Sequence, residues 1–153
     1  MSNPSLNIRQ AVPSDAEIIA KLGTQLGYPT SQAEAEKRLT VIIKQADQAI
    51  YVAEIEGIGG VGWIHIAEMH LLVMEPHAEI VGLVTDESHR SLGIGSALVA
   101  TAEEWALNRG YNCIRVRSNL VRTRAHTFYE KLGYQCQKTQ HAFVKSLSKS
   151  RDI

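Results

Sequence analysis

Apolar residues recur along the chain with two kinds of spacing, and the spacings alternate. Spacings of three and four residues, typical of a helix with one buried face, predict four helices. Alternating or consecutive apolar residues between them predict strands. The expected order is β-α-α-β-β-β-α-β-α-β-β. The predicted helices cover residues 14–25, 31–46, about 94–109 and 122–132. The predicted strands cover residues 6–11, 49–55, 61–72, 78–85, 112–117, 134–138 and 141–147.

Short polar signals mark the ends of these elements. Ser14-x-x-Glu17 and Ser31-x-x-Glu34 have the spacing of a capping box, in which two side chains cap the first turn of a helix. Gly110 and Gly133 follow the last two helices and suit the left-handed residue that ends a helix. Gly82 lies inside an apolar strand, which indicates a bulge or a close backbone approach.

This order of elements predicts an α/β fold. Strand–helix–strand units imply some parallel pairing, whereas hairpins imply antiparallel pairing. We expect one mixed, mostly antiparallel, twisted sheet of six to seven strands, with about four helices on both faces. The length of 153 residues fits a single domain over 1–153, with 148–153 as a frayed tail.

Composition narrows the class of protein. The 16 basic residues balance the 16 acidic ones, which argues against a general nucleic-acid binder. The N-terminus lacks the pattern of a secretory signal, and no apolar run approaches the roughly 18 residues that span a bilayer. We therefore expect a cytoplasmic protein without a membrane or nucleic-acid partner. Cys113, Cys136, Trp63 and Trp105 are expected in the core, and the histidines show no metal spacing.

The stretch from Val84 to Leu98 carries the most specific chemistry. An apolar strand ends there, a polar segment and two glycines follow, and then a long helix begins. The first N–H groups of a helix have no internal partner, and the helix dipole adds positive charge at that end. Glycine lets this backbone approach a ligand closely. The stretch therefore predicts a phosphate site.

Two motifs, Arg90-x-x-Gly93-x-Gly95 and the segment 119–134, together resemble those of the GNAT superfamily of acetyl-CoA-dependent N-acetyltransferases. Arg90-x-x-Gly93-x-Gly95 resembles the pyrophosphate signature Arg/Gln-x-x-Gly-x-Gly/Ala. The segment 119–134 resembles Asn…Ala-x-x-Phe-Tyr-x-x-x-Gly-Phe/Tyr and follows in the same order. The order of elements resembles the GNAT fold over nearly the whole chain.

The resemblance implies acetyl-CoA as co-substrate and no metal. The backbone from Leu92 to Ala97 would hold the pyrophosphate, and the strand end would pair with the pantetheine arm. Asn119 would hydrogen-bond that arm; a cap of the helix over 122–132 is the alternative. Within a basic group of residues 115–124, Arg124 would reach the ribose 3′-phosphate; a solvated face is the alternative. The residues expected to contact acetyl-CoA are Leu83, Val84, Thr85, Arg90, Ser91, Leu92, Gly93, Ile94, Gly95, Ser96, Ala97, Asn119, Arg124 and Tyr129.

Acetyl transfer from a thioester to an amine needs a base and an acid. The resemblance implies that Tyr129 donates a proton or hydrogen bond to the leaving thiolate, and a backbone N–H at Val84 or its neighbour would stabilise the oxyanion. Glu79, six residues before Thr85, is the preferred base, because an amine is mostly protonated at pH 7. Both side chains could instead be structural. The alternative bases are Asp86, Glu75, His77 and ordered water.

We therefore expect an enzyme that acetylates a primary amine of a small molecule by direct attack in a ternary complex. A protein lysine or N-terminal amine is the alternative acceptor, and an acetyl-CoA-binding regulatory module is the alternative outside enzymes. The acceptor would contact the first two helices, their connecting loop and residues 67–77. A homodimer through the C-terminal strands is a further expectation.

Overall fold

The computed structural model describes residues 5–90, 92–117 and 123–148. The chain divides into two compact parts, with the boundary after Arg117. The second part contains α4 (Thr123–Lys131). The first part contains all the strands and the other helices. Their bounds are β1 (Leu6–Gln10), α1 (Ala16–Leu26), α2 (Gln32–Ile43), β2 (Gln48–Ile55), β3 (Gly59–Met69), β4 (His77–Thr85), α3 (Ile94–Asn108) and β5 (Ile114–Val116). The predicted order is confirmed as far as α4.

The strands of the first part form one sheet in the order β1-β2-β3-β4-β5. Three neighbouring pairs are antiparallel, and β4 pairs with β5 in parallel. Helix α3 makes the crossover that a parallel pair requires. The mixed, mostly antiparallel sheet is confirmed, with five strands in the described residues instead of six to seven.

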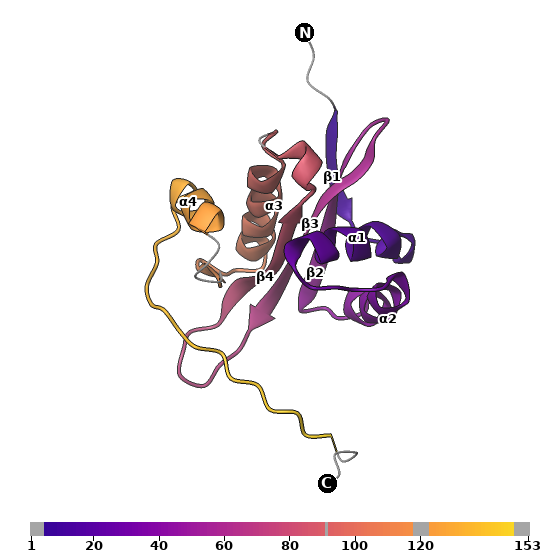
Figure 1. Cartoon of the computed structure of the whole chain (residues 1–153). Helices are drawn as coiled ribbons and strands as arrows, with labels where there is room; N and C mark the ends of the chain where they lie inside the picture. The colour runs from indigo at the N-terminus through magenta and orange to yellow at the C-terminus, as the bar shows by residue number, and fades with distance from the viewer. Residues whose placement is uncertain (1–4, 91, 118–122, 149–153) are drawn as a thin grey trace. The chain divides into compact units, whose positions relative to one another are not determined.

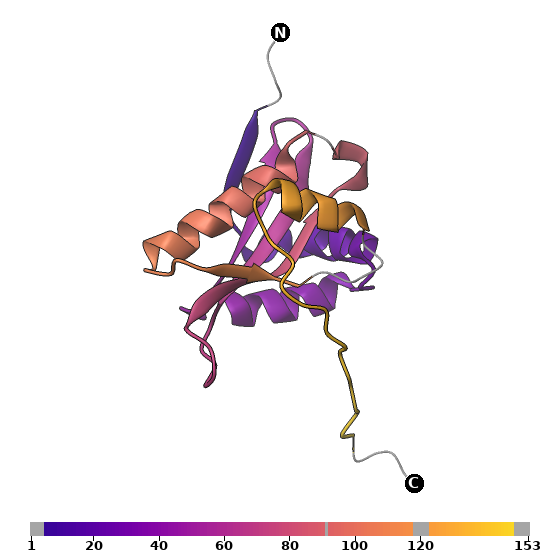
Figure 2. The ribbon, with the colours of Figure 1, turned by 90° about the vertical axis from the view of Figure 1, so that its left-hand side faces the viewer.

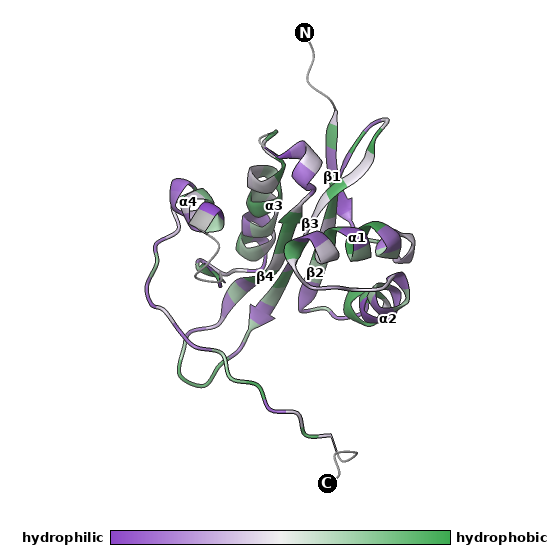
Figure 3. Cartoon of the chain, viewed as in Figure 1, coloured by the Kyte–Doolittle hydropathy of each residue, from purple (hydrophilic) through white to green (hydrophobic). Residues whose placement is uncertain are grey.

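Helices cover both faces of this sheet, as Figures 1 and 2 show: α1 and α2 lie on one face and α3 on the other. Figure 3 shows apolar residues concentrated on the central strands and on the inner sides of these helices. Leu22 of α1 and Leu39 of α2 are buried on one face, and Leu98 of α3 on the other. The central strands β3 and β4 are thereby held between two layers of helices.

The two strands predicted at 134–138 and 141–147 are not formed, which corrects the sequence-based order. Residues 135–148 have no regular structure and are exposed; Phe143 and Val144 are 93% and 95% accessible to solvent. A strand needs a hydrogen-bonded neighbour, and the described residues supply none to this segment. An alternating pattern alone is therefore insufficient here. The single domain and the homodimer stay predictions.

Two smaller expectations also need correction. Ser14 and Glu17 do not form a capping box, because α1 begins at Ala16 and the Asp15 carboxylate accepts the N–H of Val12 at 2.7 Å. Both cysteines, placed in the core by the sequence, are exposed. The second box is confirmed: Ser31 Oγ accepts the Glu34 N–H at 3.1 Å, and Glu34 Oε1 accepts the Ser31 N–H at 2.9 Å.

Candidate active site

Strand β4 separates from β5 halfway along its length. Their pairing covers residues 78–80 of β4, from Ala78 opposite Ile114 to Ile80 opposite Val116, and then ends. At the same level the pairing with β3 shifts, so that Val81 is an extra residue in β4. Such a bulge bends a strand and increases its twist. Beyond it, residues 82–85 remain paired with β3, and their other edge is free of any strand of the described residues.

The backbone groups on this free edge follow from the register. The N–H of Asp86 donates to the Val61 carbonyl oxygen of β3 at 2.8 Å. Successive residues of a strand direct their N–H and C=O groups to opposite edges. Val84 therefore faces β3, whereas Leu83 and Thr85 present their backbone groups at the free edge. These two residues can hydrogen-bond an extended ligand as an added strand would.

Gly82 follows the bulge, and its missing side chain makes room for Trp63 of β3. A Cβ at Gly82 would lie 2.8 Å from Trp63 Cζ3, closer than the packing allows. The far side of the same indole faces α1, where Cζ2 would lie 4.0 Å from a Cβ at Gly23. Trp63 thus lies between β4 and α1, on the face opposite α3. Glycine at position 82 therefore allows the Trp63 side chain to lie close to the backbone of β4 beside the bulge.

The segment after β4 is anchored to α1 through one side chain. Gln25 donates from Nε2 to Asp86 Oδ1 at 3.3 Å and accepts the N–H of Glu87 on Oε1 at 3.1 Å. Asp86 is buried and also accepts the N–H of Ser88 at 3.2 Å. Burial acts to raise the pKa of Asp86, but these hydrogen bonds and His89 lower it overall. The start of the segment therefore has a fixed position and a negative charge.

The N-terminus of α3 has the features of an anion site. Gly93, with φ of 78°, is its N-cap, and a Cβ there would meet nothing within 4 Å. The Ala97 N–H is the first to bond inside the helix, to the Gly93 carbonyl at 3.1 Å, so the N–H groups of residues 93–96 lack an intrahelical acceptor. Leu92 and Arg90 are exposed beside them, and Ser91 lies outside the described residues. An anionic group can approach this open backbone.

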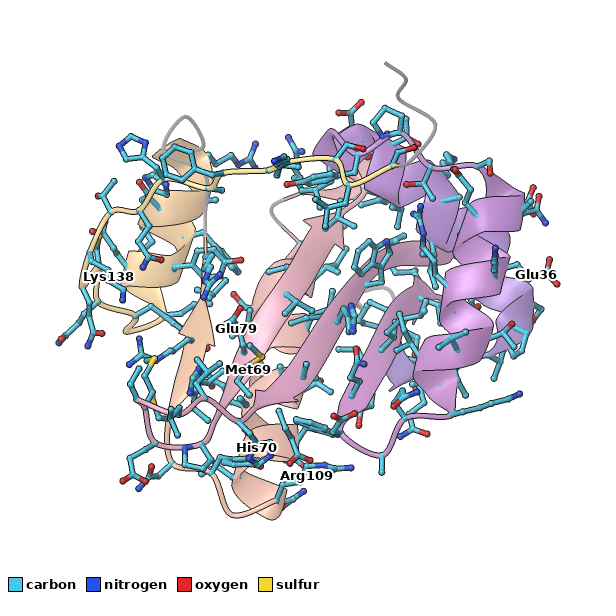
Figure 4. The ribbon with its side chains drawn as sticks, turned by 90° about the horizontal axis from the view of Figure 1, so that it is seen from below. Glu36, Met69, His70, Glu79, Arg109 and Lys138 are labelled. Atoms are coloured by element: carbon cyan, nitrogen blue, oxygen red, sulfur yellow. The ribbon has the colours of Figure 1, made fainter. Side chains whose placement is uncertain are left out.

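Glu79 lies on β4 before the bulge, with its side chain between β4 and β5 (Figure 4). It is only 7% exposed. Its Oε1 is 3.9 Å from His77 Nε2, and its Oε2 is 3.8 Å from Arg117 Nε. Within the described residues no donor is within hydrogen-bond distance of either oxygen, so the carboxylate can accept a proton or a hydrogen bond from a ligand or water.

The neighbours of Glu79 on this face are mostly nitrogen donors. Arg115 is directly opposite Glu79 in the register with β5. His65 lies on β3 and contacts Gln48 Oε1 through Nε2 at 2.7 Å; burial lowers the pKa of His65, which keeps the ring neutral at pH 7. Arg115 Nε and Trp63 Nε1 are buried without a hydrogen-bond partner in the described residues.

Tyr129 lies on α4, in the second part of the chain, which is described by itself. Its ring makes edge contacts with Phe128 and Tyr134, at centroid distances of 5.2 and 5.7 Å. Arg124 on the same helix is exposed. Asn119, expected to contact the pantetheine arm, lies outside the described residues. The ring contacts support one face of Tyr129 and are kept by a phenylalanine at this position.

The described residues contain no group of three side chains that could hold a metal ion. Among them, no helix is long and apolar enough to cross a bilayer.

Comparison with known proteins identifies relatives of this chain. The model of a family described as "Acetyltransferase (GNAT) family" matches residues 18–134. The "Uncharacterized N-acetyltransferase YhfO" of Bacillus subtilis (strain 168) is 28% identical over 85% of this chain and 90% of its own length. The "Aminoglycoside N(6')-acetyltransferase type 1" of Stenotrophomonas maltophilia is 25% identical over 84% of this chain and 85% of its own length.

Among solved structures, aminoglycoside N-acetyltransferase AAC(6')-Iy in complex with CoA has a similar fold. Its TM-score is 0.83, with 18% identity over 96% of this chain and 98% of that chain. The mixed α/β fold of this chain is therefore a known architecture.

Proposed function

The chain belongs to the GNAT acetyltransferase family and is an N-acetyltransferase, and from this we propose that it transfers acetyl from acetyl-CoA to a primary amine of a small molecule. The separation of β4 from β5 at Val81 is the observation that carries the proposal. It leaves a free strand edge over residues 82–85, which begins beyond Glu79 and runs toward the N-terminus of α3.

The residues along this edge fit acetyl-CoA. The backbone groups of Leu83 and Thr85 suit the amides of a pantetheine arm, and the free N–H groups at the start of α3 suit a pyrophosphate. Gly93 leaves that backbone uncovered. When bound, acetyl-CoA supplies the thioester carbonyl that an amine attacks. Contacts from Arg90, Ser91, Asn119 and Arg124 remain part of the proposal.

Two side chains would move the protons. Glu79 accepts the proton of the attacking amine, directly or through a water, because its carboxylate is buried and has no hydrogen-bond donor of its own in the described residues. Tyr129 donates to the leaving thiolate. The N–H of Leu83 or Thr85, rather than that of Val84, is free to stabilise negative charge on the carbonyl oxygen. Transfer is direct, with both substrates bound.

A small acceptor is favoured by the similarity to two proteins named as aminoglycoside acetyltransferases. A protein lysine or N-terminal amine is the second candidate acceptor. The cytoplasmic location and the homodimer stay predictions.

The test is the release of free CoA thiol from acetyl-CoA in the presence of small amines and of lysine-containing peptides. Faster release with a small amine supports the proposal. Release of CoA with peptides alone would favour the second candidate, a protein amine as acceptor. Binding of acetyl-CoA without release for any amine would contradict it.

A further inference from the structure

Two arginines and a single carboxylate surround the proposed acceptor position. Arg115 is next to Glu79 across the β4–β5 pair, and Arg117 Nε lies 3.8 Å from Glu79 Oε2. Arg115 is opposite Glu79 and Arg117 is two residues further on, so both side chains lie on the same face of the sheet as Glu79, the face that α1 and α2 cover. His65 adds no charge there, because burial lowers its pKa. Glu79 balances one arginine, and among the described residues no second carboxylate forms an ion pair with the other.

The same face also has more donors than acceptors. Arg115 Nε and Trp63 Nε1 are buried, and neither has a hydrogen-bond partner among the described residues. Trp63 lies on the α1 face, as its packing against Gly23 and Gly82 shows. A buried N–H without an acceptor is destabilising, and such groups are rare in folded proteins. Arg115 is the one of the two that is level with Glu79, and an oxygen atom of a molecule bound there would satisfy its nitrogen.

The phosphates of CoA would bind too far from Arg115 to accept its hydrogen bonds. The anion site at α3 follows Thr85, six residues beyond Glu79 along the strand. At roughly 3.3 Å per residue, this separates the two positions by about 20 Å. Arg115 is level with Glu79, at the end of the free edge where the acetyl group and the amine would meet.

We infer that the acceptor amine carries a carboxylate close to its amino group, as an amino acid does. This inference rests on the proposed function. Neighbouring strands are about 5 Å apart, so a carboxylate at Arg115 and an amine at Glu79 are separated by only a few bonds of the acceptor. Arginine binds carboxylates through paired hydrogen bonds, which gives the preference its geometry. A polycation such as an aminoglycoside would bring positive charges toward Arg115 and Arg117.

The test compares amines that differ only in a carboxylate. Phenylalanine is paired with phenethylamine and ornithine with putrescine, with kanamycin as a polycation, and free CoA thiol is measured. In the unmodified protein we expect kcat/KM to be at least about 10-fold higher for a carboxylated amine than for its partner. In Arg117→Gln we expect the ratio of kcat/KM between the two members of a pair to shrink, through a higher KM for the carboxylated member.

Arg117 is 73% exposed in its side chain, so this substitution is compatible with folding. Arg115→Lys is a second variant that keeps the charge but not the paired geometry, and it should lose part of the advantage. Arg38→Gln on the exposed surface of α2 is the matched control and should keep it.

The outcomes separate this inference from the proposed function. Equal or faster turnover of the carboxylate-free members overturns the inference and leaves the proposed function standing. An advantage that persists in both Arg117→Gln and Arg115→Lys also overturns it. Absence of CoA release with every amine overturns the proposed function, and the inference with it.

Discussion

His77 and Glu79 lie on one face of β4 with His77 Nε2 3.9 Å from Glu79 Oε1, and both residues are buried. His77 Nδ1 is 3.0 Å from the carbonyl oxygen of Glu75, which can only accept, so Nδ1 carries the ring proton. Nε2 is therefore the ring nitrogen that faces the carboxylate. A separation of 3.9 Å is too long for a hydrogen bond, so the Glu79 oxygens stay open to a ligand or water, which suits Glu79 to the role of base.

The first prediction concerns this base. We expect Glu79→Gln to lower kcat by about 10²-fold at neutral pH, because an amide cannot accept the amine proton. CoA thiol release measures the effect. Glu75→Gln is the matched control: Glu75 is an exposed carboxylate next to the same strand, and its side chain should be dispensable. Equal losses in the two variants would argue against Glu79 as the base.

A second prediction concerns the proposed acid. Tyr129→Phe keeps the ring contacts with Phe128 and Tyr134 but removes the hydroxyl. We expect turnover to fall by roughly 10-fold or more, within the usual contribution of a positioned acid. Tyr134→Phe removes a hydroxyl from the neighbouring ring and serves as control. Unchanged turnover in Tyr129→Phe would remove Tyr129 from the mechanism.

A third prediction compares two glycines that contact the same indole. Gly82→Ala should destabilise the fold by about 1–3 kcal/mol, because the new Cβ would lie 2.8 Å from the Trp63 ring and the indole would have to shift. Gly23→Ala should be neutral or stabilise by up to about 1 kcal/mol, because its Cβ would have ordinary contacts inside a helix. Urea denaturation of both variants measures the difference. A loss of stability in Gly23→Ala as large as that in Gly82→Ala would contradict this account.

The parts of the site that could be predicted from the sequence are those set by local rules. The start of α3 follows from Gly93 and the apolar spacing after it, because a helix needs only its own residues to form hydrogen bonds. The capping box of Ser31 and Glu34 is confirmed for the same reason. The C-terminal strands were wrong because pairing depends on a partner that no local pattern contains.

Contacts between distant segments had no signal in the sequence. Gln25 and Asp86 are 61 residues apart, and no motif connects them. The fit of Trp63 over Gly82 depends on the register of β3 and β4, which the bulge at Val81 shifts by one residue. The sequence indicated an unusual glycine at position 82, but the reason for it required the sheet.

A fourth prediction concerns stability at low pH. Asp15 is buried and accepts two hydrogen bonds from Arg9, at 2.8 and 2.9 Å. The bond from Arg9 is the main cause that lowers the pKa of Asp15, against the effect of burial. Since the folded pKa is below the unfolded value near 3.9, the stabilisation is present above that value and is lost as the pH falls through the folded pKa.

We therefore expect Asp15→Asn to lower the free energy of unfolding by about 2 kcal/mol at pH 7, with a difference that narrows below about pH 4. Denaturation at a series of pH values measures it. Glu36→Gln on the exposed side of α2 is the control (Figure 4). A difference that stays constant down to pH 2 would show that the ion pair is not its source.

The last prediction concerns the anchor between α1 and the segment that leads to α3. Gln25 holds Asp86 and the N–H of Glu87 through both ends of its amide, so Gln25→Ala removes both contacts while keeping a good helix former. Because the first N–H groups of α3 follow this segment, their position becomes less defined. We expect KM for acetyl-CoA to rise several-fold, about 5- to 10-fold, with a smaller change in kcat.

The matched control is Lys21→Ala, one turn earlier on α1 and exposed, which should leave KM unchanged. Titration calorimetry with CoA provides an independent measure, since a loosened anchor weakens binding in the absence of an acceptor. A normal affinity for CoA in Gln25→Ala would mean that α3 and its own N-cap, Gly93, are sufficient to define the anion site without α1.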